Sequence, residues 1–177
     1  MKKTALALLV FALCGISLPS CGDNDEPEDN SIGRYEVTYN CELTSDMCDL
    51  LNMEGDFCNE NGEFCHFVVP QNMSDKFIFT KFPTEFGFSV EAMSKKPDVE
   101  LTKDSYSFGI TAYLKIGIYS KSGKLLREYQ KYAYLSKTTP CSQTHVETEL
   151  NRLVNSGPIF ASFTQVDAEG KIVESDK

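Results

Sequence analysis

Apolar and polar residues alternate with a period of two through most of this chain, and this pattern constrains the fold more than any other feature. In the segment 35–41 the odd-numbered residues are apolar, and in 110–118 the even-numbered ones are. Successive side chains of a β-strand point to opposite faces of the sheet, so each segment predicts a strand with one buried face. We therefore expect a mainly β fold.

The same pattern predicts about eight strands and a single helix. Strands are expected at 34–41, 64–69, 76–82, 86–90, 105–120, 124–135, 158–166 and 171–174. A capping box at Thr144-His145-Val146-Glu147 starts a helix with one apolar face, and Gly157-Pro158 ends it. Seven to nine antiparallel strands with one helix near the C-terminus predict a sandwich or a partly closed barrel. A two-layer α+β sheet is the alternative.

The first twenty residues have the features of an export signal. Two lysines follow Met1, and the uncharged apolar run 5–16 is too short to span a membrane as a helix. The run leads into Leu18-Pro19-Ser20-Cys21, which resembles the lipobox of bacterial lipoproteins. The resemblance implies cleavage after residue 20 and a diacylglycerol on the Cys21 thiol. An ordinary secretory peptide with a spare cysteine is the alternative.

An acidic segment follows the predicted lipidation site. Residues 22–30 contain five acids and no apolar side chain that could be buried, so 21–31 is expected to be a tether and 32–177 a single β-rich domain. The acidic run resembles the signal that sends some lipoproteins to the outer face of the outer membrane. We expect a lipid-anchored, surface-exposed protein, with attachment facing the periplasm as the alternative. The net charge of −9 argues against nucleic acid as a partner.

Five cysteines remain after the predicted anchor, which is an odd number for an oxidising compartment: Cys41, Cys48, Cys58, Cys65 and Cys141. Asn61-Gly62 favours a two-residue hairpin turn, which would place Cys58 opposite Cys65 at disulfide distance. A second bridge could join Cys41 to Cys48, leaving Cys141 as the free thiol, or Cys141 could pair with Cys41 or Cys48 instead. Zinc is the rival interpretation, but gaps of six residues do not fit its usual ligand spacing, and no metal is expected.

Charge is divided unevenly along the predicted domain. The segment 35–75 has nine acids and no Lys or Arg, whereas 76–137 has eleven bases and six acids. The two segments could therefore pair in one sheet, although a solvated surface of mixed sign is the simpler interpretation.

Catalytic motifs are absent from the sequence. His66 and His145 are the only histidines, and no nucleophile elbow, metalloprotease helix or phosphate-binding loop occurs. We expect no catalytic residues and no cofactor, and instead a non-catalytic module that binds an extracellular glycan or protein. A structural subunit of the envelope is the alternative, and a hydrolase is less favoured.

Aromatic residues are the candidates for ligand contact, with core packing as the other role open to them. They are Phe77, Phe79, Phe82, Phe86 and Phe88, and Tyr106, Tyr113, Tyr119, Tyr129, Tyr132 and Tyr134. The chain has no Trp, which provides the largest face for stacking on sugars.

Overall fold

The computed structural model describes residues 29–81, 85–136, 140–167 and 169–175, so the predicted signal peptide and Cys21 lie outside the described residues. The described residues form eleven strands and two helices. They are β1 (Ile32–Leu43), α1 (Ser45–Leu50), β2 (Leu51–Cys58), β3 (Phe64–Val68), β4 (Asn72–Phe79), β5 (Glu85–Lys95), β6 (Ser105–Tyr106), β7 (Gly109–Ser120), β8 (Leu125–Ser136), β9 (Cys141–Ser142), α2 (Gln143–Asn155), β10 (Phe160–Val166) and β11 (Ile172–Ser175).

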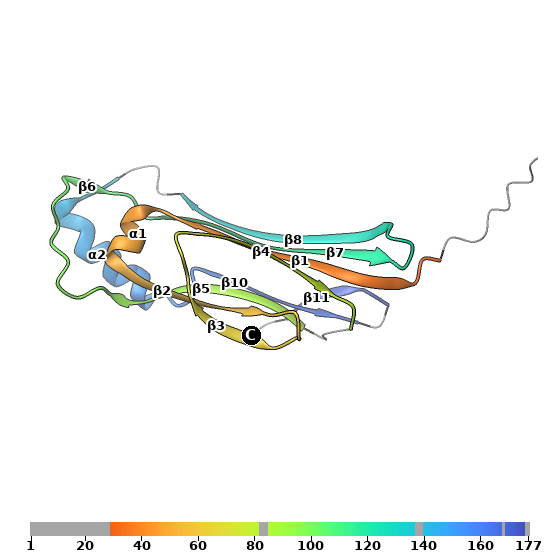
Figure 1. Cartoon of the computed structure of the whole chain (residues 1–177). Coiled ribbons are helices and arrows are strands. Elements are labelled where there is room, and N and C mark those ends of the chain that lie inside the picture. The colour runs from red at the N-terminus through yellow and green to blue at the C-terminus, as the bar shows by residue number, and fades with distance from the viewer. Residues whose placement is uncertain (1–28, 82–84, 137–139, 168, 176–177) are drawn as a thin grey trace, which may run out of the picture.

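Two antiparallel sheets form a sandwich (Figure 1). One sheet has the strand order β4-β1-β7-β8 and the other the order β11-β10-β5-β2-β3, while β6 and β9 form a separate pair. The predicted mainly β, antiparallel fold with a helix near the C-terminus is confirmed, and the sheets do not close into a barrel. The structure has more elements than expected because 105–120 divides into β6 and β7, and because β2, β9 and α1 are not among the predicted strands and helix.

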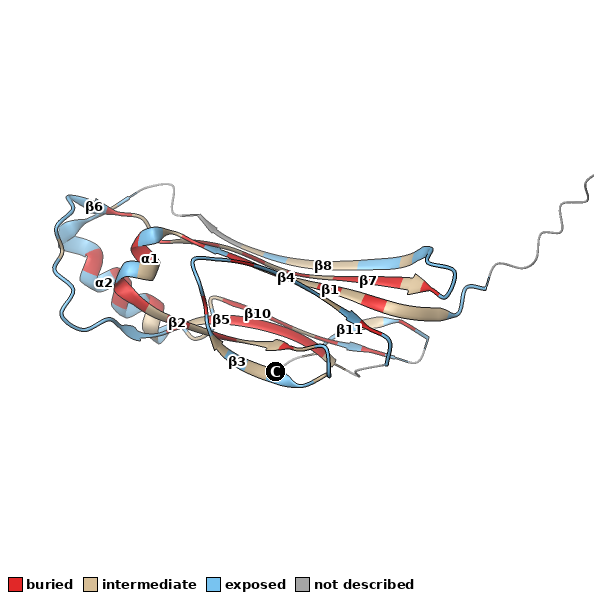
Figure 2. Ribbon diagram, in the orientation of Figure 1, coloured by how far each residue is buried: buried red, intermediate tan, exposed pale blue. Residues whose placement is uncertain are grey.

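Burial follows the alternation in the sequence (Figure 2). Tyr35, Val37, Tyr39 and Cys41 of β1 are almost completely buried, whereas the residues between them are half-buried. The even-numbered apolar residues of β7 are buried in the same way. The strands β1 and β7 therefore give one face to the core between the sheets and the other to the surface, whereas residues 86–90 of β5 are buried on both faces.

An aromatic cluster centred on Tyr39 joins the two sheets. The Tyr39 ring lies 5.4 Å from the ring of Phe88 and 5.7 Å from that of Phe57, both in the opposite sheet. Its hydroxyl donates a 2.8 Å hydrogen bond to the carbonyl of Cys58. Burial strongly raises the pKa of this hydroxyl, so Tyr39 stays neutral and its hydrogen bond satisfies the buried polar group.

Both helices lie at one end of the sandwich (Figure 1). The helix α2 packs on β5 through Val146, Leu150 and Leu153, as its apolar face predicts. Its N-cap is Ser142, two residues before the Thr144 of the predicted capping box, and no side-chain hydrogen bond caps the helix there, so the predicted capping box is wrong. In α1 the buried carboxylate of Asp46 accepts a 2.6 Å hydrogen bond from the backbone N–H of Ser107, which holds the chain that leads into β7.

The hairpin between β2 and β3 differs from the prediction, and this difference removes the expected disulfide. Asn59 closes the turn against Glu63 through a 2.8 Å N–H···O bond, and Gly62 has a positive φ of 81°. The loop therefore has three residues and not two, with a bulge at Gly62. Cys58 lies opposite Phe64 instead of Cys65, so the two cysteine side chains point to opposite faces of the sheet.

None of the five described cysteines forms a disulfide, and the predicted bridges Cys58–Cys65 and Cys41–Cys48 are both wrong. Cys41 points into the core from β1, whereas Cys48 is half-buried on α1. Burial raises the pKa of Cys41 to about 12 and that of Cys58 to about 11. Cys141 is unbridged in the structure, like the other four cysteines.

Thiol labelling tests this arrangement. In protein purified from its native envelope and then denatured, alkylation should modify all five cysteines of the domain. In the folded protein Cys41 and Cys58 should react at least about tenfold more slowly than Cys65 and Cys141, because they are buried and carry little thiolate. Fewer than five alkylated residues in the denatured chain would mean that bridges form after all.

Candidate functional site

Polar and aromatic side chains gather on the two outer faces of the sandwich, and we consider each face in turn. On the five-stranded sheet, Glu54 and Asp56 of β2 lie two residues apart and so share a face. His66 of β3 is the cross-strand partner of Asp56. The register of one hairpin therefore assembles these three side chains, which we call the histidine cluster.

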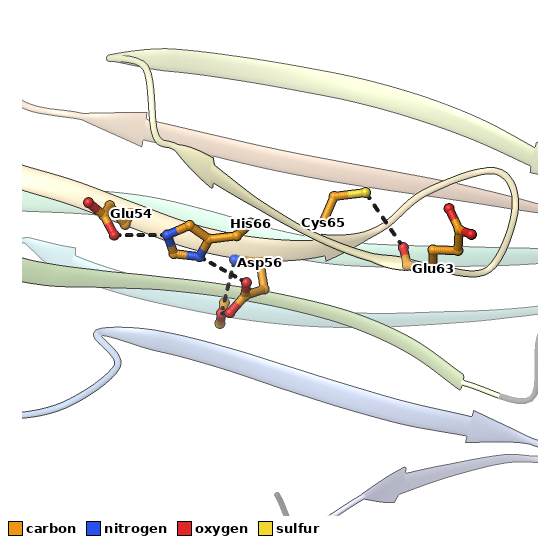
Figure 3. A network of polar contacts seen from close by, with 6 residues as sticks. Glu54, Asp56, Glu63, Cys65 and His66 are labelled. Carbon is orange, nitrogen blue, oxygen red and sulfur yellow. Dashed lines mark hydrogen bonds and ion pairs between the residues drawn. The ribbon is translucent and has the colours of Figure 1, made fainter.

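His66 lies between the two carboxylates (Figure 3). Its Nε2 is 2.8 Å from Glu54 and its Nδ1 is 3.0 Å from Asp56. The hydrogen bond with Glu54 and then that with Asp56 raise the pKa of His66. The protonated ring, which donates from both nitrogens, is the form that this geometry stabilises.

The histidine cluster does not resemble a catalytic triad. Ser89 of β5 is 3.4 Å from a carboxylate oxygen of Asp56, and no hydrogen bond joins it to His66. Both ring nitrogens of His66 already have a carboxylate partner, so the ring has no nitrogen left to accept a proton from a nucleophile. Within the described residues, no group of three or more His, Cys, Asp or Glu is placed to hold a metal ion.

A shallow groove of about 230 Å³ lies on the outer face of the four-stranded sheet. Gly117, in the middle of β7, has no side chain and leaves room at the centre of the sheet. The ring of Tyr119 leans over this glycine, and a Cβ at position 117 would lie 2.9 Å from the ring. The groove is lined by Glu36, Thr38, Lys76, Tyr113, Lys115, Gly117 and Tyr119.

Ion pairs surround the groove and fix its charged groups. Glu36 lies 2.5 Å from the ammonium of Lys76 and 3.0 Å from the guanidinium of Arg34. The hydrogen bond from Lys76, followed by that from Arg34, lowers the pKa of Glu36, which is therefore ionised at neutral pH. On the other side Lys115 pairs with Glu128 at 2.8 Å. Of these pairs, Glu36–Lys76 joins the acidic segment 35–75 to the basic segment 76–137, whereas Lys115 and Glu128 both belong to the basic segment.

The tyrosine rings at the groove are held by their neighbours. The guanidinium of Arg34 lies over the ring of Tyr119, 4.5 Å from its centroid. The Tyr113 ring packs 5.3 Å from that of Tyr132, which is 62% exposed. Both contacts restrict ring rotation, so the groove presents aromatic surface whose orientation is already fixed.

The other aromatic candidates divide between the core, the sandwich edge and the undescribed parts of the chain. Phe79, Phe86, Phe88 and Tyr106 are buried, and Phe77 is half-buried against the core. Tyr129 donates a hydrogen bond to Glu174 at the edge where β8 meets β11. Phe82 and the side chain of Tyr134 lie outside the described residues.

Comparisons with known proteins found no match: no family model, no curated protein and no solved structure resembles this chain significantly. Among the described residues, no helix is both long and apolar enough to cross a membrane.

The histidine cluster predicts a pH-dependent contribution to stability. The pKa of His66 is higher in the folded than in the unfolded chain, so its stabilising effect is complete below the unfolded value of about 6.5 and is lost as pH rises through the folded value. At about pH 6 the melting temperature of wild type should therefore be higher than that of His66→Ala, and the difference between the two temperatures should shrink towards about pH 9. Differential scanning calorimetry of both proteins over this pH range measures the two temperatures.

Glu54→Gln provides the matched control, because it removes the main partner and keeps the histidine. This variant should lose much of the same pH dependence. Another acid, Glu91, lies opposite Glu54 on β5, and it stays unchanged in all the proteins compared. Wild-type and His66→Ala melting curves that stay parallel over the whole pH range would contradict the assignment.

Proposed function

We propose that this protein is a lipid-anchored component of the cell envelope that binds an extracellular saccharide, without converting it, in the groove on its four-stranded sheet. The observation that carries this proposal is the combination of fixed tyrosine rings and balanced ion pairs around Gly117. The proposal agrees with the sequence, which predicts an exported chain and contains no catalytic motif.

The size of the groove suits a small ring. Its volume of about 230 Å³ is below the range of about 300–1,000 Å³ that is usual for enclosed sites for drug-sized ligands. It is also shallow and opens on a flat sheet. A longer chain could therefore place one ring in the groove and continue along the sheet surface past the exposed Tyr132.

The chemistry of the groove suits hydroxyl groups more than a charged ligand. Lys76 and Lys115 offer donors, Glu36 offers acceptor oxygens, and Thr38 offers both. Each lysine already has a carboxylate partner, so neither cation presents an uncompensated charge to an anion. Sugar hydroxyls can donate and accept at once, and the apolar faces of a sugar ring can lie against the rings of Tyr113 and Tyr119.

Hydrolysis of a bound sugar would need groups that the groove does not provide. Glycosidases use two carboxyl groups on either side of the scissile bond, and Glu36 is the single carboxylate among the residues that line the groove. Its pKa is lowered by Lys76, which makes it a poor general acid. The groove is therefore suited to holding a ligand and not to cleaving it.

Filling the groove should abolish ligand binding. Gly117→Val adds a β-branched side chain that a strand accepts well, but it occupies the groove and displaces Tyr119. The probes are neutral oligosaccharides of glucose, galactose, mannose, xylose and N-acetylglucosamine, measured by isothermal titration calorimetry. We expect wild type to bind at least one of them and the variant to bind it at least about tenfold more weakly.

Ser74→Val is the matched control, because it places the same side chain on the exposed face of β4 outside the groove. It should bind like wild type. Tyr113→Ala should also weaken binding through loss of an aromatic wall. Wild type that binds none of the probes, or Gly117→Val that binds as tightly as wild type, would contradict the proposal.

The anchor makes a separate prediction. Cys21→Ser removes the thiol that would carry the lipid, so this variant should move from the membrane fraction to the soluble fraction and should lose the mass of the lipid. Cys14→Ser, which changes another cysteine before the domain, should stay with the membrane. Equal membrane association of Cys21→Ser and wild type would refute the lipid anchor.

A further inference from the structure

Three segments that are distant in the sequence meet at the end of the sandwich opposite the helices (Figure 1). The backbone N–H of Lys121, in the β7–β8 turn, donates to the carbonyl of Ser31 at 3.0 Å. In the β10–β11 turn, Gly170 lies against the side chain of Ile32 and accepts a 3.0 Å hydrogen bond from Arg127. The chain that comes from Cys21 enters the domain at this same end.

The β7–β8 turn carries basic and apolar residues at this end. We call residues 120–127 the hairpin tip; they contain three bases, Lys121, Lys124 and Arg127, and no acid. All three are exposed, and Leu125 between them is 45% exposed. This local group of bases contrasts with the net charge of −9 of the whole chain. Basic side chains around an exposed leucine favour contact with an anionic lipid surface.

The neighbouring β10–β11 turn adds a fourth exposed base, Lys171, and two nearby acids are directed towards backbone groups. The carboxylate of Asp29 accepts the N–H of Ser31, and that of Asp167 accepts the N–H groups of Glu169 and Lys171. These two acids therefore close their own turns, and the hydrogen bonds with Ser31, followed by the nearby charge of Lys121, lower the pKa of Asp29. Glu169 remains as an exposed acid at this end.

A recess of about 250 Å³ opens beside the hairpin tip. Ile32, Ile118 and Leu126 give it apolar walls, Arg127 contributes a guanidinium, and the exposed carboxylate of Glu169 also lines it. Apolar walls next to a cation suit the part of a phospholipid where the phosphate joins the acyl chains.

The predicted anchor keeps this end close to the bilayer. The nine residues 22–30 cannot span more than about 30 Å even when fully extended. Because this segment limits how far the domain can move away, the hairpin tip stays at a high local concentration of lipid headgroups, and modest attraction is enough to hold it there.

We propose that the hairpin tip is a membrane-docking surface that binds anionic headgroups of the bilayer in which the anchor sits, with Leu125 entering the interface. This inference rests on the lipid anchor proposed above and does not depend on the ligand of the groove. Docking at this end directs the helices away from the membrane and leaves both outer sheet faces, including the groove, at the sides of the standing sandwich (Figure 1).

Lysine labelling of the lipidated full chain tests the proposal. The protein is reconstituted into vesicles of phosphatidylcholine alone or of phosphatidylcholine with phosphatidylglycerol, acetylated with an amine-reactive ester and analysed by mass spectrometry. Lys121, Lys124 and Lys171 should react several-fold more slowly in the anionic vesicles, and high salt should restore their rates. Lys95 and Lys96, exposed at the helix end, should react equally in both.

Matched variants test the cause of the protection. Lys121→Gln with Lys124→Gln should abolish the protection of Lys171, whereas Lys95→Gln with Lys96→Gln should leave it unchanged. Equal labelling of all lysines in both vesicle types would overturn the proposal. Protection of the same size in detergent would also overturn it, because the acidic segment 22–28 and not lipid would then cover the tip. The intact mass, measured first, shows separately whether Cys21 carries the lipid. A chain without the lipid would overturn both the anchor and the docking surface, but not the ligand-binding groove.

Discussion

The packing of Tyr39 between the two sheets is the interaction on which the rest of the structure depends. Its ring contacts Phe57 and Phe88 of the opposite sheet and Phe77 of the neighbouring strand, and its hydroxyl binds the carbonyl of Cys58. Because the aromatic rings fill the space between the sheets, the inner faces of β1, β2 and β5 cannot slide or separate without exposing them. The outer faces are thereby held as rigid surfaces.

This rigidity gives different properties to the two outer faces. The four-stranded sheet has a groove beside Gly117 that neighbouring tyrosines and ion pairs surround, so the proposed ligand would meet a surface that is already formed. On the five-stranded sheet the ring of His66 already occupies the space between Glu54 and Asp56. The first face is therefore the better candidate for binding, while the second stabilises its hairpin in a way that depends on pH.

Local sequence patterns predicted well which segments form strands, but they predicted poorly how the strands pair with one another. The alternation in 35–41 and 110–118 depends on one segment at a time, and both segments are strands with the expected buried face. The Asn61-Gly62 pair fits turns of two or three residues, and this one-residue difference shifted the register and separated Cys58 from Cys65. The groove was not predictable, since strand order decides that Glu36 and Lys76 lie beside Gly117.

The most direct test of the central claim is to locate the bound ligand on the domain. Backbone amide shifts of the protein can be recorded by NMR during titration with the oligosaccharide that binds most tightly. Our account predicts that the largest changes fall on β1 and β7 around Thr38 and Gly117. Changes that centre on His66 and the five-stranded sheet, or on the helix end, would show that the groove is not the binding site.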